Sequence, residues 1–444
     1  MNQDIMPTYT GKCCWKDRSV YVESYGCAAN RFDLEIMLYH LFREGYRLVQ
    51  DPTSASLILM NTCGVKKPTE DKILQRLSLL SKLGRPIVIS GCLPKIDYEG
   101  LVKVAPDFSA MLDPWSVDRI IEVVRSAESG EKNRIFFSDE PTTKIYQPKI
   151  RINPCVEIIS VSEGCTGACA FCCVRFARGK LFSYPKEAIV ERVREAVSEG
   201  VKEIWLTSQD MGAYGLDNGA YMPTLLDEIC QINGKFFCRV GMMNPDNVMR
   251  MLDDLISSFK HEKILKFLHI PVQSGDDEIL RRMNRKYRVE DFKKIVWSFR
   301  KEIPDITIST DVICGFPGES REAFQNTVKL ILEVQPDVVN ISKFYPRPKT
   351  PAAEMEQIDR AEVNYRSRSL VAIVKEVSLR NNLRWIGWEG EILVDEKGKG
   401  LSWVGRNYAY KPIVVKCDGN LLGRFVRVRV IEARPTYLEA EIIN

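Results

Sequence analysis

The 444-residue sequence contains few histidines and no long hydrophobic run. Only His40, His261 and His269 occur, which argues against a zinc site built from several imidazoles. No stretch approaches the roughly 18 apolar residues of a membrane-spanning helix. The polar residues 1–10 lack the apolar segment of a signal peptide. We therefore expect a cytoplasmic protein.

Strong charge of one sign is also missing. The chain has 63 Lys and Arg against 59 Asp and Glu, a net charge of +4, so bulk charge neither requires nor excludes nucleic acid. Cysteine, in contrast, occurs 14 times. Without a secretion signal, these cysteines indicate a reducing compartment and metal binding instead of disulfides. The length predicts two to four domains, each able to bury a core.

Three cysteines in a C-x3-C-x2-C pattern, Cys165, Cys169 and Cys172, follow the apolar run 156–161. A cubane [4Fe–4S] cluster has four irons, normally held by four thiolates. Three close cysteines with no nearby fourth would leave one iron open to a small molecule. The alternatives are a zinc site, a redox dithiol of Cys169 and Cys172, and inert cysteines. The pattern favours an iron–sulfur site.

A second group of three cysteines is predicted in the first third of the chain. The apolar runs 20–22, 57–60 and 87–89 read as buried strands, and a cysteine follows each one: Cys27, Cys63 and Cys92. Helical patterns separate the runs, which predicts a parallel sheet. The carboxyl ends of such strands gather at one edge, where ligands bind. The sequence therefore predicts a second site of three thiolates, the alternative being three unrelated turn cysteines.

The middle of the chain predicts a partial (β/α)6 barrel. Six apolar runs alternate with amphipathic helical patterns, and in such barrels the working residues lie at the carboxyl ends of the strands. The polar side chains at these ends suit a cavity beside the first cluster, with His269 as a base or an orienting partner. The predicted cofactor-binding residues among them are Ser208, Asp210, Asn244, Gln273, Ser274 and Asp311.

Beyond residue 378 the apolar pattern changes to a period of two, which predicts a small antiparallel β-barrel. Arg427 and Arg429 should share its outer face and, with Arg406, contact phosphates. Arg285 and Arg288 lie in a basic run, 281–288, which is either a solvated helix end or a further phosphate contact. The expected α/β architecture has four parts: an N-terminal parallel domain at 1–125, a linker at 126–150, the partial barrel at 151–372 and the β-barrel at 378–444.

Several motifs resemble known families. The first cysteine group, with Phe171 at the aromatic position, is similar to the radical S-adenosylmethionine (SAM) superfamily. Residues 177–180, 310–319 and 344–353, with the three-domain layout, resemble the methylthiotransferase family, although Lys349 stands where that family usually has glycine. Residues 204–215 and 241–245 are most similar to its archaeal and eukaryotic branch.

The resemblance implies a radical SAM enzyme that adds a methylthio group to N6-threonylcarbamoyladenosine at position 37 of tRNA. It implies SAM, bound beside Phe171, and two [4Fe–4S] clusters, the first for radical formation and the second, on Cys27, Cys63 and Cys92, for sulfur transfer. It further implies tRNA, a low-potential electron donor such as a ferredoxin or flavodoxin, a sulfur source, and a TRAM-like C-terminal barrel. The alternatives are isopentenyladenosine tRNA or a ribosomal-protein side chain as substrate, or a non-catalytic iron–sulfur carrier.

Animal relatives in this family carry a C-terminal hydrophobic anchor. The sequence ends at Asn444 without an apolar run, so no membrane attachment is expected.

Overall fold

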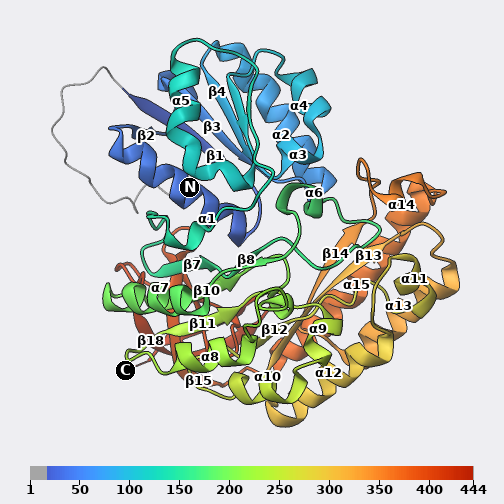
Figure 1. Cartoon of the computed structure of the whole chain (residues 1–444). Coiled ribbons are helices and arrows are strands. Elements are labelled where there is room, and N and C mark those ends of the chain that lie inside the picture. Colours follow the sequence, from blue (N-terminus) through green and yellow to red (C-terminus); the bar gives the residue numbers. More distant parts are fainter. Residues whose placement is uncertain (1–17, 444) are drawn as a thin grey trace.

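The computed structural model describes residues 18–443. Figure 1 shows an α/β N-terminal domain (residues 18–136) above a larger central domain (residues 151–383), with the strands of a C-terminal barrel (residues 389–442) against the far side of the central domain. Within residues 18–443, no helix has the length and apolar character needed to cross a lipid bilayer.

The sheet of the N-terminal domain has six strands, all parallel, in the order β2-β1-β3-β4-β5-β6. The three predicted strands are β1, β3 and β4 at its centre. Short strands that the sequence pattern missed extend it, and one of them, β6, lies within the predicted linker. The strands are β1 (Ser19–Ser24), β2 (Arg47–Val49), β3 (Leu57–Thr62), β4 (Ile87–Gly91), β5 (Ala110–Leu112) and β6 (Arg134–Phe136).

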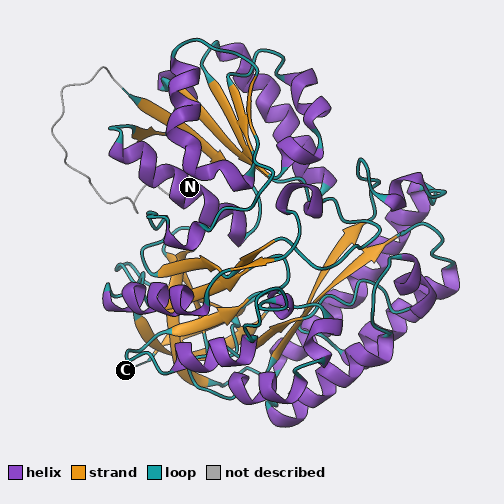
Figure 2. Ribbon diagram, viewed as in Figure 1, coloured by secondary structure: helices purple, strands orange, loops and turns teal. Residues whose placement is uncertain are grey.

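Helices cover both faces of this sheet (Figure 2). The helix α5 buries Ile120, Val123, Val124 and Ala127, the i, i+3, i+4, i+7 stripe of an amphipathic helix. The helix α1 differs, because Asp33 and other polar residues are buried along with its apolar ones where it packs on the central domain. The helices are α1 (Ala28–Arg43), α2 (Lys67–Leu80), α3 (Leu93–Ile96), α4 (Tyr98–Val104) and α5 (Ile120–Glu128), with 3-10 turns η1 (Pro52–Ser54), η2 (Ser81–Leu83), η3 (Pro114–Arg119) and η4 (Lys144–Tyr146).

The central domain is the predicted partial barrel. Two sheets of three parallel strands, in the orders β11-β10-β7 and β12-β13-β14, are linked by a parallel bridge between Cys238 and Ile264. The six strands are β7 (Val156–Ser160), β10 (Glu203–Thr207), β11 (Phe237–Val240), β12 (Phe267–His269), β13 (Thr307–Cys314) and β14 (Val338–Lys343). A small hairpin, β8 (Ser162–Glu163) and β9 (Phe182–Ser183), flanks the first cysteine loop.

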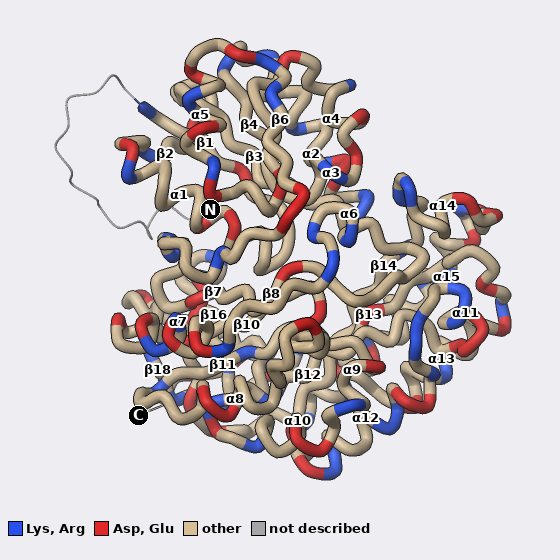
Figure 3. The backbone as a smooth tube through the Cα atoms, viewed as in Figure 1, with Lys and Arg blue, Asp and Glu red and all other residues tan. Residues whose placement is uncertain are grey.

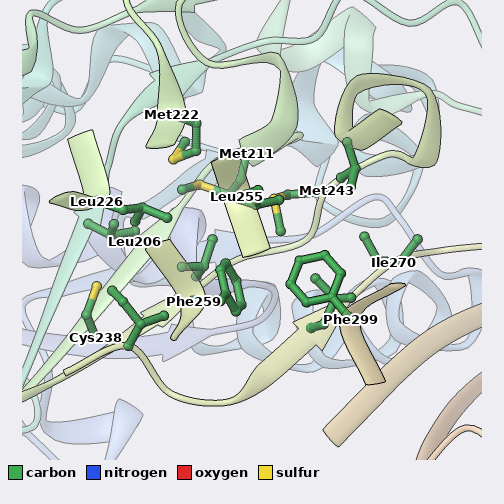
Figure 4. Packing of buried hydrophobic residues seen from close by; sticks show 14 of the residues in the cluster. Leu206, Met211, Met222, Leu226, Cys238, Met243, Leu255, Phe259, Ile270 and Phe299 are labelled. Atoms are coloured by element: carbon green, nitrogen blue, oxygen red, sulfur yellow. The ribbon is translucent and has the colours of Figure 1, made fainter. Parts of the chain in front are cut away.

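The helices of the central domain are α6 (Val174–Arg178), α7 (Lys186–Ser198), α8 (Met222–Cys230), α9 (Pro245–Met249), α10 (Leu252–Phe259), α11 (Asp277–Arg282), α12 (Val289–Glu302), α13 (Arg321–Val334), α14 (Pro351–Glu354) and α15 (Arg360–Leu383), with the 3-10 turn η5 (Met211–Ala213). The longer ones pack their apolar stripes on the outside of the strands (Figure 4), where Phe259 and Phe299 meet edge to face with ring centroids 5.4 Å apart. The short α6 instead contacts α3, and α11 and α14 belong to a separate apolar cluster with Phe316. The long α15 runs across the boundary expected between residues 372 and 378.

Five strands close into the C-terminal barrel in the order β15-β16-β17-β19-β18. Its neighbours are antiparallel, as predicted, except for the parallel pair β17 and β19. The strands are β15 (Glu389–Lys397), β16 (Ser402–Arg406), β17 (Pro412–Lys416), β18 (Phe425–Ala433) and β19 (Leu438–Ile442). A buried ion pair between Lys411 and Asp337, 2.7 Å long, fastens the barrel to the central domain.

A second buried charge cluster lies between the C-terminal barrel and strand β10. Burial, together with the charge of Asp395, raises the pKa of Glu203 to about 8. Burial also raises the pKa of Asp395 to about 6, although Arg406 opposes it from 3.8 Å away. The Glu203 carboxylate accepts a 2.6 Å hydrogen bond from the indole of Trp205. This interface therefore holds two buried carboxyl groups whose charge is offset in part by Arg406 and, for Glu203, by Arg239.

Candidate functional site

The first cysteine group lies on the loop between β8 and α6, where Cys165, Cys169 and Cys172 are all partly exposed. The Gly167 amide donates a 3.2 Å hydrogen bond to the Cys165 sulfur. A Cβ on Gly167 would stand 3.3 Å from that sulfur and 3.7 Å from the sulfur of Cys169, so glycine keeps open the concave side of the loop. Burial raises the pKa of Cys165 to about 11 and that of Cys172 to about 12.

Arg285 faces this loop from the segment after α11. Its guanidinium donates to the Cys169 sulfur at 3.1 Å and to the side-chain oxygen of Asn244. Asn244 in turn donates to Asp210 at 2.6 Å, and Asp210 also accepts from Asn247 at 2.8 Å. The ends of β10 and β11 are thereby tied to the cysteine loop. Donors to sulfur stabilise the thiolate form that binds metal.

The second cysteine group follows the carboxyl ends of β1, β3 and β4, as the sequence predicted. Cys27 is exposed, whereas Cys63 and Cys92 are buried. Burial raises the pKa of Cys92 to about 12, and the charges of Cys27 and Cys63 act in the same direction, so the three sulfurs lie within electrostatic range of one another. A Cβ on Gly26, whose φ is +121°, would stand 3.2 Å from the Cβ of Cys63.

A buried arginine also stands beside the second group. Arg178, 1% exposed, lies on α6 of the central domain, and its positive charge acts to lower the pKa of Cys92. It donates to Asn30 at 2.7 Å and pairs with Asp33 at 2.6 Å, both on α1, and with Glu163 at 2.9 Å. Lys144 pairs with the same two carboxylates, at 2.5 and 2.6 Å. Two cations and two carboxylates thus join the N-terminal and central domains next to the cysteines.

Cys173 lies between the two groups. It is buried, and its thiol donates to the backbone oxygen of Gly64 at 3.2 Å. The charge of Cys173 acts to raise the pKa of both Cys63 and Cys172. Both cysteine groups therefore face the same interdomain interface, which Figure 1 shows around α6 and β8.

Neither group has the geometry of a single-ion site. Among residues 18–443, no three His, Cys, Asp or Glu side chains converge as the ligands of one metal ion do. This observation concerns single ions, because each thiolate of a cubane cluster binds a different iron. The open loop at Gly167, the donors to sulfur and the all-sulfur ligand sets are compatible with iron–sulfur clusters.

A cavity of about 400 Å³ opens beside both groups. One wall comes from the N-terminal domain, at the segment that follows Cys63, and the other from β13, β14 and the cysteine loop. Its polar lining includes Lys66, Lys67, Gln273, Asp311, Lys343, Tyr345 and Arg347, and Phe171 is among its apolar members.

Asp311 is fixed at the cavity wall by two neighbours. The Nε2 of His269 lies 3.1 Å from one of its oxygens, and Asn340 donates to the other at 2.8 Å. Although burial acts to raise the pKa of Asp311, the hydrogen bonds and charge of His269 lower it overall. His269 is thus an orienting partner of Asp311 in this structure. Gln273 has a positive φ of 66°, a strained conformation typical of residues held in place at a site.

The other predicted cofactor-binding residues occupy less open positions. Ser208 accepts from the Asp210 amide at 3.2 Å, and Asp210 is buried with its carboxylate bound to protein donors. Ser274 is fully buried and lies 3.5 Å from the Thr327 hydroxyl. None of these three residues is among those that line the cavity.

The predicted RNA-contacting arginines fall into two sets. Arg288, Arg427 and Arg429 are exposed, in accord with the expected outer face. Arg285 binds the cysteine loop, and Arg406, at the end of β16, is half-buried beside Asp395 of the same barrel, so neither presents its guanidinium to a solvated face. The period-two pattern and the basic run identify these arginines as candidates for RNA contact. They do not predict which side chains each arginine contacts in the folded protein.

Sequence reasoning missed the buried cations Arg178, Lys144 and Arg347. Arg178 lies in the motif 177–180, which indicates only the family resemblance. No feature of the neighbouring sequence predicts that this residue lies between two domains. Arg347 pairs with Glu70 of the N-terminal domain. Complementary charges in two distant segments are the only sequence signal that could have suggested such pairs.

Sequence profiles of three families match the chain. The Radical SAM superfamily matches residues 159–331, the Uncharacterized protein family UPF0004 matches residues 19–113, and the TRAM domain matches residues 384–443. The three matches fall on the central domain, the N-terminal domain and the C-terminal barrel.

Curated relatives match along nearly the full chain. This chain is 42% identical to the probable threonylcarbamoyladenosine tRNA methylthiotransferase of Pyrococcus horikoshii, and the match covers 96% of this chain and 99% of that protein. The identity to the corresponding Archaeoglobus fulgidus protein is 41%, over 95% and 98%. The threonylcarbamoyladenosine tRNA methylthiotransferase of Homo sapiens is 35% identical, over 96% of this chain and 74% of that protein.

Among solved structures, the chain is similar to the radical S-adenosylmethionine methyltransferase TsrM from Kitasatospora setae. The TM-score is 0.57 with 14% identity, covering 76% of this chain and 77% of that one. At this identity the likeness shows the fold alone, and it agrees with the observed succession of an α/β domain and a partial barrel.

Proposed function

The chain belongs to the threonylcarbamoyladenosine tRNA methylthiotransferase family of radical SAM enzymes, and from this premise we propose that it converts N6-threonylcarbamoyladenosine at tRNA position 37 to its 2-methylthio derivative. The observation that carries the proposal is the meeting of two three-cysteine groups and one cavity at a single domain interface. A carrier of iron–sulfur clusters has no need of such a cavity.

Cys165, Cys169 and Cys172 would hold a [4Fe–4S] cluster with one iron left for SAM. When bound, this cluster supplies the electron that generates a carbon radical from SAM. The chain's own contribution is to orient and to exclude water. Gly167 and Arg285 donate to two of the sulfurs, and Phe171, which meets Phe316 edge to face with centroids 6.5 Å apart, closes the apolar side of the cavity.

Cys27, Cys63 and Cys92 would hold a second [4Fe–4S] cluster, from which the sulfur is delivered. An unactivated aromatic C–H needs a radical, and the incoming sulfur needs a position separate from the iron that binds SAM. The burial of Cys63 and Cys92 keeps water away, and Arg178 offsets the negative charge of thiolates.

The substrate tRNA would lie across the interface, with base 37 in the cavity and the backbone on exposed arginines of the C-terminal barrel and of the segment before α12. The matched TRAM domain and the names of the relatives support tRNA as partner. A low-potential electron donor and a sulfur source complete the proposed partners, and the reaction would take place in the cytoplasm.

Iron analysis tests the two-cluster part of the proposal. Anaerobically prepared protein should contain about eight irons, and C165A and C27A should each retain about four. C230A, which removes a buried thiol outside both groups, should retain about eight. Full iron in the C27A protein would contradict the second cluster.

Nucleoside analysis tests the substrate. After incubation with SAM, sulfide and reductant, tRNA carrying N6-threonylcarbamoyladenosine should yield its 2-methylthio derivative by mass spectrometry, and the C27A protein should yield none. A product on isopentenyladenosine tRNA or on a ribosomal protein, with none on this tRNA, would reassign the substrate. If the protein does not cleave SAM in the presence of a strong reductant, its assignment as a radical SAM enzyme would be rejected.

A further inference from the structure

The interdomain cavity has an excess of positive charge. Lys66, Lys67, Lys343 and Arg347 line it, against the single carboxylate of Asp311. Figure 3 shows Lys and Arg segments of the central domain around α6 and at the loop before α14. A cavity of this charge favours an anionic ligand group.

Two of these cations are already neutralised. Lys67 pairs with Glu70 at 2.7 Å and with Asp71 at 3.0 Å. Arg347 pairs with Glu70 as well. Both side chains therefore have little charge left for a ligand, and the pair of Arg347 with Glu70 joins the central domain to the N-terminal domain.

The other two cations form no ion pair with any residue in the range 18–443. Lys343, at the end of β14, donates to the neutral side chain of Asn364 on α15 at 2.7 Å, and among residues 18–443 it has no ion pair. Lys66 is exposed and forms no ion pair within that same range, although its charge acts to lower the pKa of Asp311, the carboxylate held by His269 and Asn340. The two lysines come from opposite domains and so from opposite walls.

The N-terminus of α2 lies in the same wall as Lys66. Lys66 is the N-cap residue, and no side chain caps this helix. In its first turn Pro68 has no N–H, and the amides of Thr69 and Glu70 both donate to the Lys66 carbonyl at 3.0 Å. The positive end of the helix dipole, and not a set of free amides, therefore adds to the attraction for an anion. The end of α2 and the Lys66 side chain thus both favour an anionic group on the N-terminal side of the cavity. Lys343 favours the same anionic group from the central domain.

Resting on the proposed function, we propose that Lys66 and Lys343 bind the free carboxylate of the threonylcarbamoyl group and so select this substrate. Threonine is joined to the base through its amino group, so its carboxylate remains as the one anionic group on the modified base. An adenosine with an apolar substituent would leave both lysines unpaired in the occupied cavity, which costs binding free energy.

The phosphate backbone is the other source of negative charge in tRNA, and a comparison of two tRNAs separates the sources. The tRNAs are identical except that adenosine 37 carries the threonylcarbamoyl group in one and is unmodified in the other. Wild-type enzyme should bind the modified tRNA about tenfold to a hundredfold more tightly, the range expected for a charge-assisted contact. K343M and K66M should each lose most of this preference while binding unmodified tRNA as the wild type does.

Two further variants serve as controls. K343R keeps the charge and should keep most of the preference. Lys286 is exposed and donates to Asn284 at 2.7 Å, which matches the lysine–asparagine pair of Lys343 outside the cavity. K286M should leave the ratio of the two affinities unchanged.

Each remaining outcome overturns the inference. An equal loss of affinity for both tRNAs in K343M and K66M would assign the lysines to phosphate contacts. An unchanged preference in both variants would place the carboxylate elsewhere. If wild-type enzyme neither prefers nor converts the modified tRNA, the proposed function fails as well. If the wild type converts the modified tRNA and both lysine variants still prefer it, only the assignment of the two lysines is rejected.

Discussion

Replacing Arg178 with methionine should destabilise the protein by about 3–5 kcal/mol, the cost of removing one partner from a buried ion pair. Arg178 is 1% exposed and contacts Asp33 and Glu163, which are equally buried. In R178M only Lys144 remains to balance these two carboxylates. One uncompensated negative charge is then buried between the N-terminal and central domains.

The pH dependence should change along with the stability. In the wild type, Lys144 and Arg178 outweigh the effect of burial and lower the pKa of Glu163. Its contribution to the free energy of unfolding is therefore present at neutral pH and is lost as pH falls through this lowered pKa. Without Arg178 the same carboxyl would bind a proton in the folded state. Between pH 8 and about 5, R178M should therefore recover stability as pH falls.

Chemical denaturation at pH 8 and pH 5.5, followed by circular dichroism, measures both effects. Arg119 provides the matched control, because it forms an exposed ion pair with Glu122 at 2.8 Å. R119M should change the free energy of unfolding by less than about 1 kcal/mol. The double variant R178M/E163Q should recover part of the loss, since it removes the unpaired charge. A loss in R178M no larger than in R119M, with no change in pH dependence, would refute the reasoning.

Two shorter predictions concern the C-terminal barrel. Because burial raises the pKa of Glu203 to about 8, the folded state binds a proton that the unfolded state releases, so stability should fall as pH rises from about 5 to 8. E203Q should flatten this dependence in thermal unfolding, and an equally steep slope in E203Q would exclude Glu203 as its source. R427A should weaken binding of both modified and unmodified tRNA and reduce the salt slope by about one, whereas R429A should reduce it by less because Arg429 already pairs with Glu389 at 2.7 Å. R406M, at a half-buried position, should leave that slope unchanged, and an equal effect would return Arg406 to the RNA-binding face.

The two cysteine groups could be predicted because their placement follows from local rules. A cysteine after each of three buried strands must reach one edge of a parallel sheet, and Cys27, Cys63 and Cys92 do. The short strand β6 was missed because its two exposed residues, Arg134 and Ile135, carry no period-two or continuous apolar signal.

The charged residues were harder to predict, because a basic residue in a sequence usually indicates a solvated surface. Arg285 lies in a run of arginines and lysines, but folding brings it to Cys169. Arg178 and Lys144 lie near Glu163 in the sequence, but their other partner, Asp33, is 111 residues away from Lys144 and still farther from Arg178. Only the tertiary structure brings these four charges together.

The two cysteine groups share one arrangement. Each has an arginine that donates to an asparagine: the buried Arg178 donates to Asn30, and the partly buried Arg285 donates to Asn244. In the second group, arginine and asparagine lie in different domains. A purely apolar contact tolerates sliding, whereas Arg178 uses its two terminal nitrogens to contact Asp33 of one domain and Glu163 of the other. We infer that these buried charges fix the position of Cys92 and its neighbours relative to the central domain.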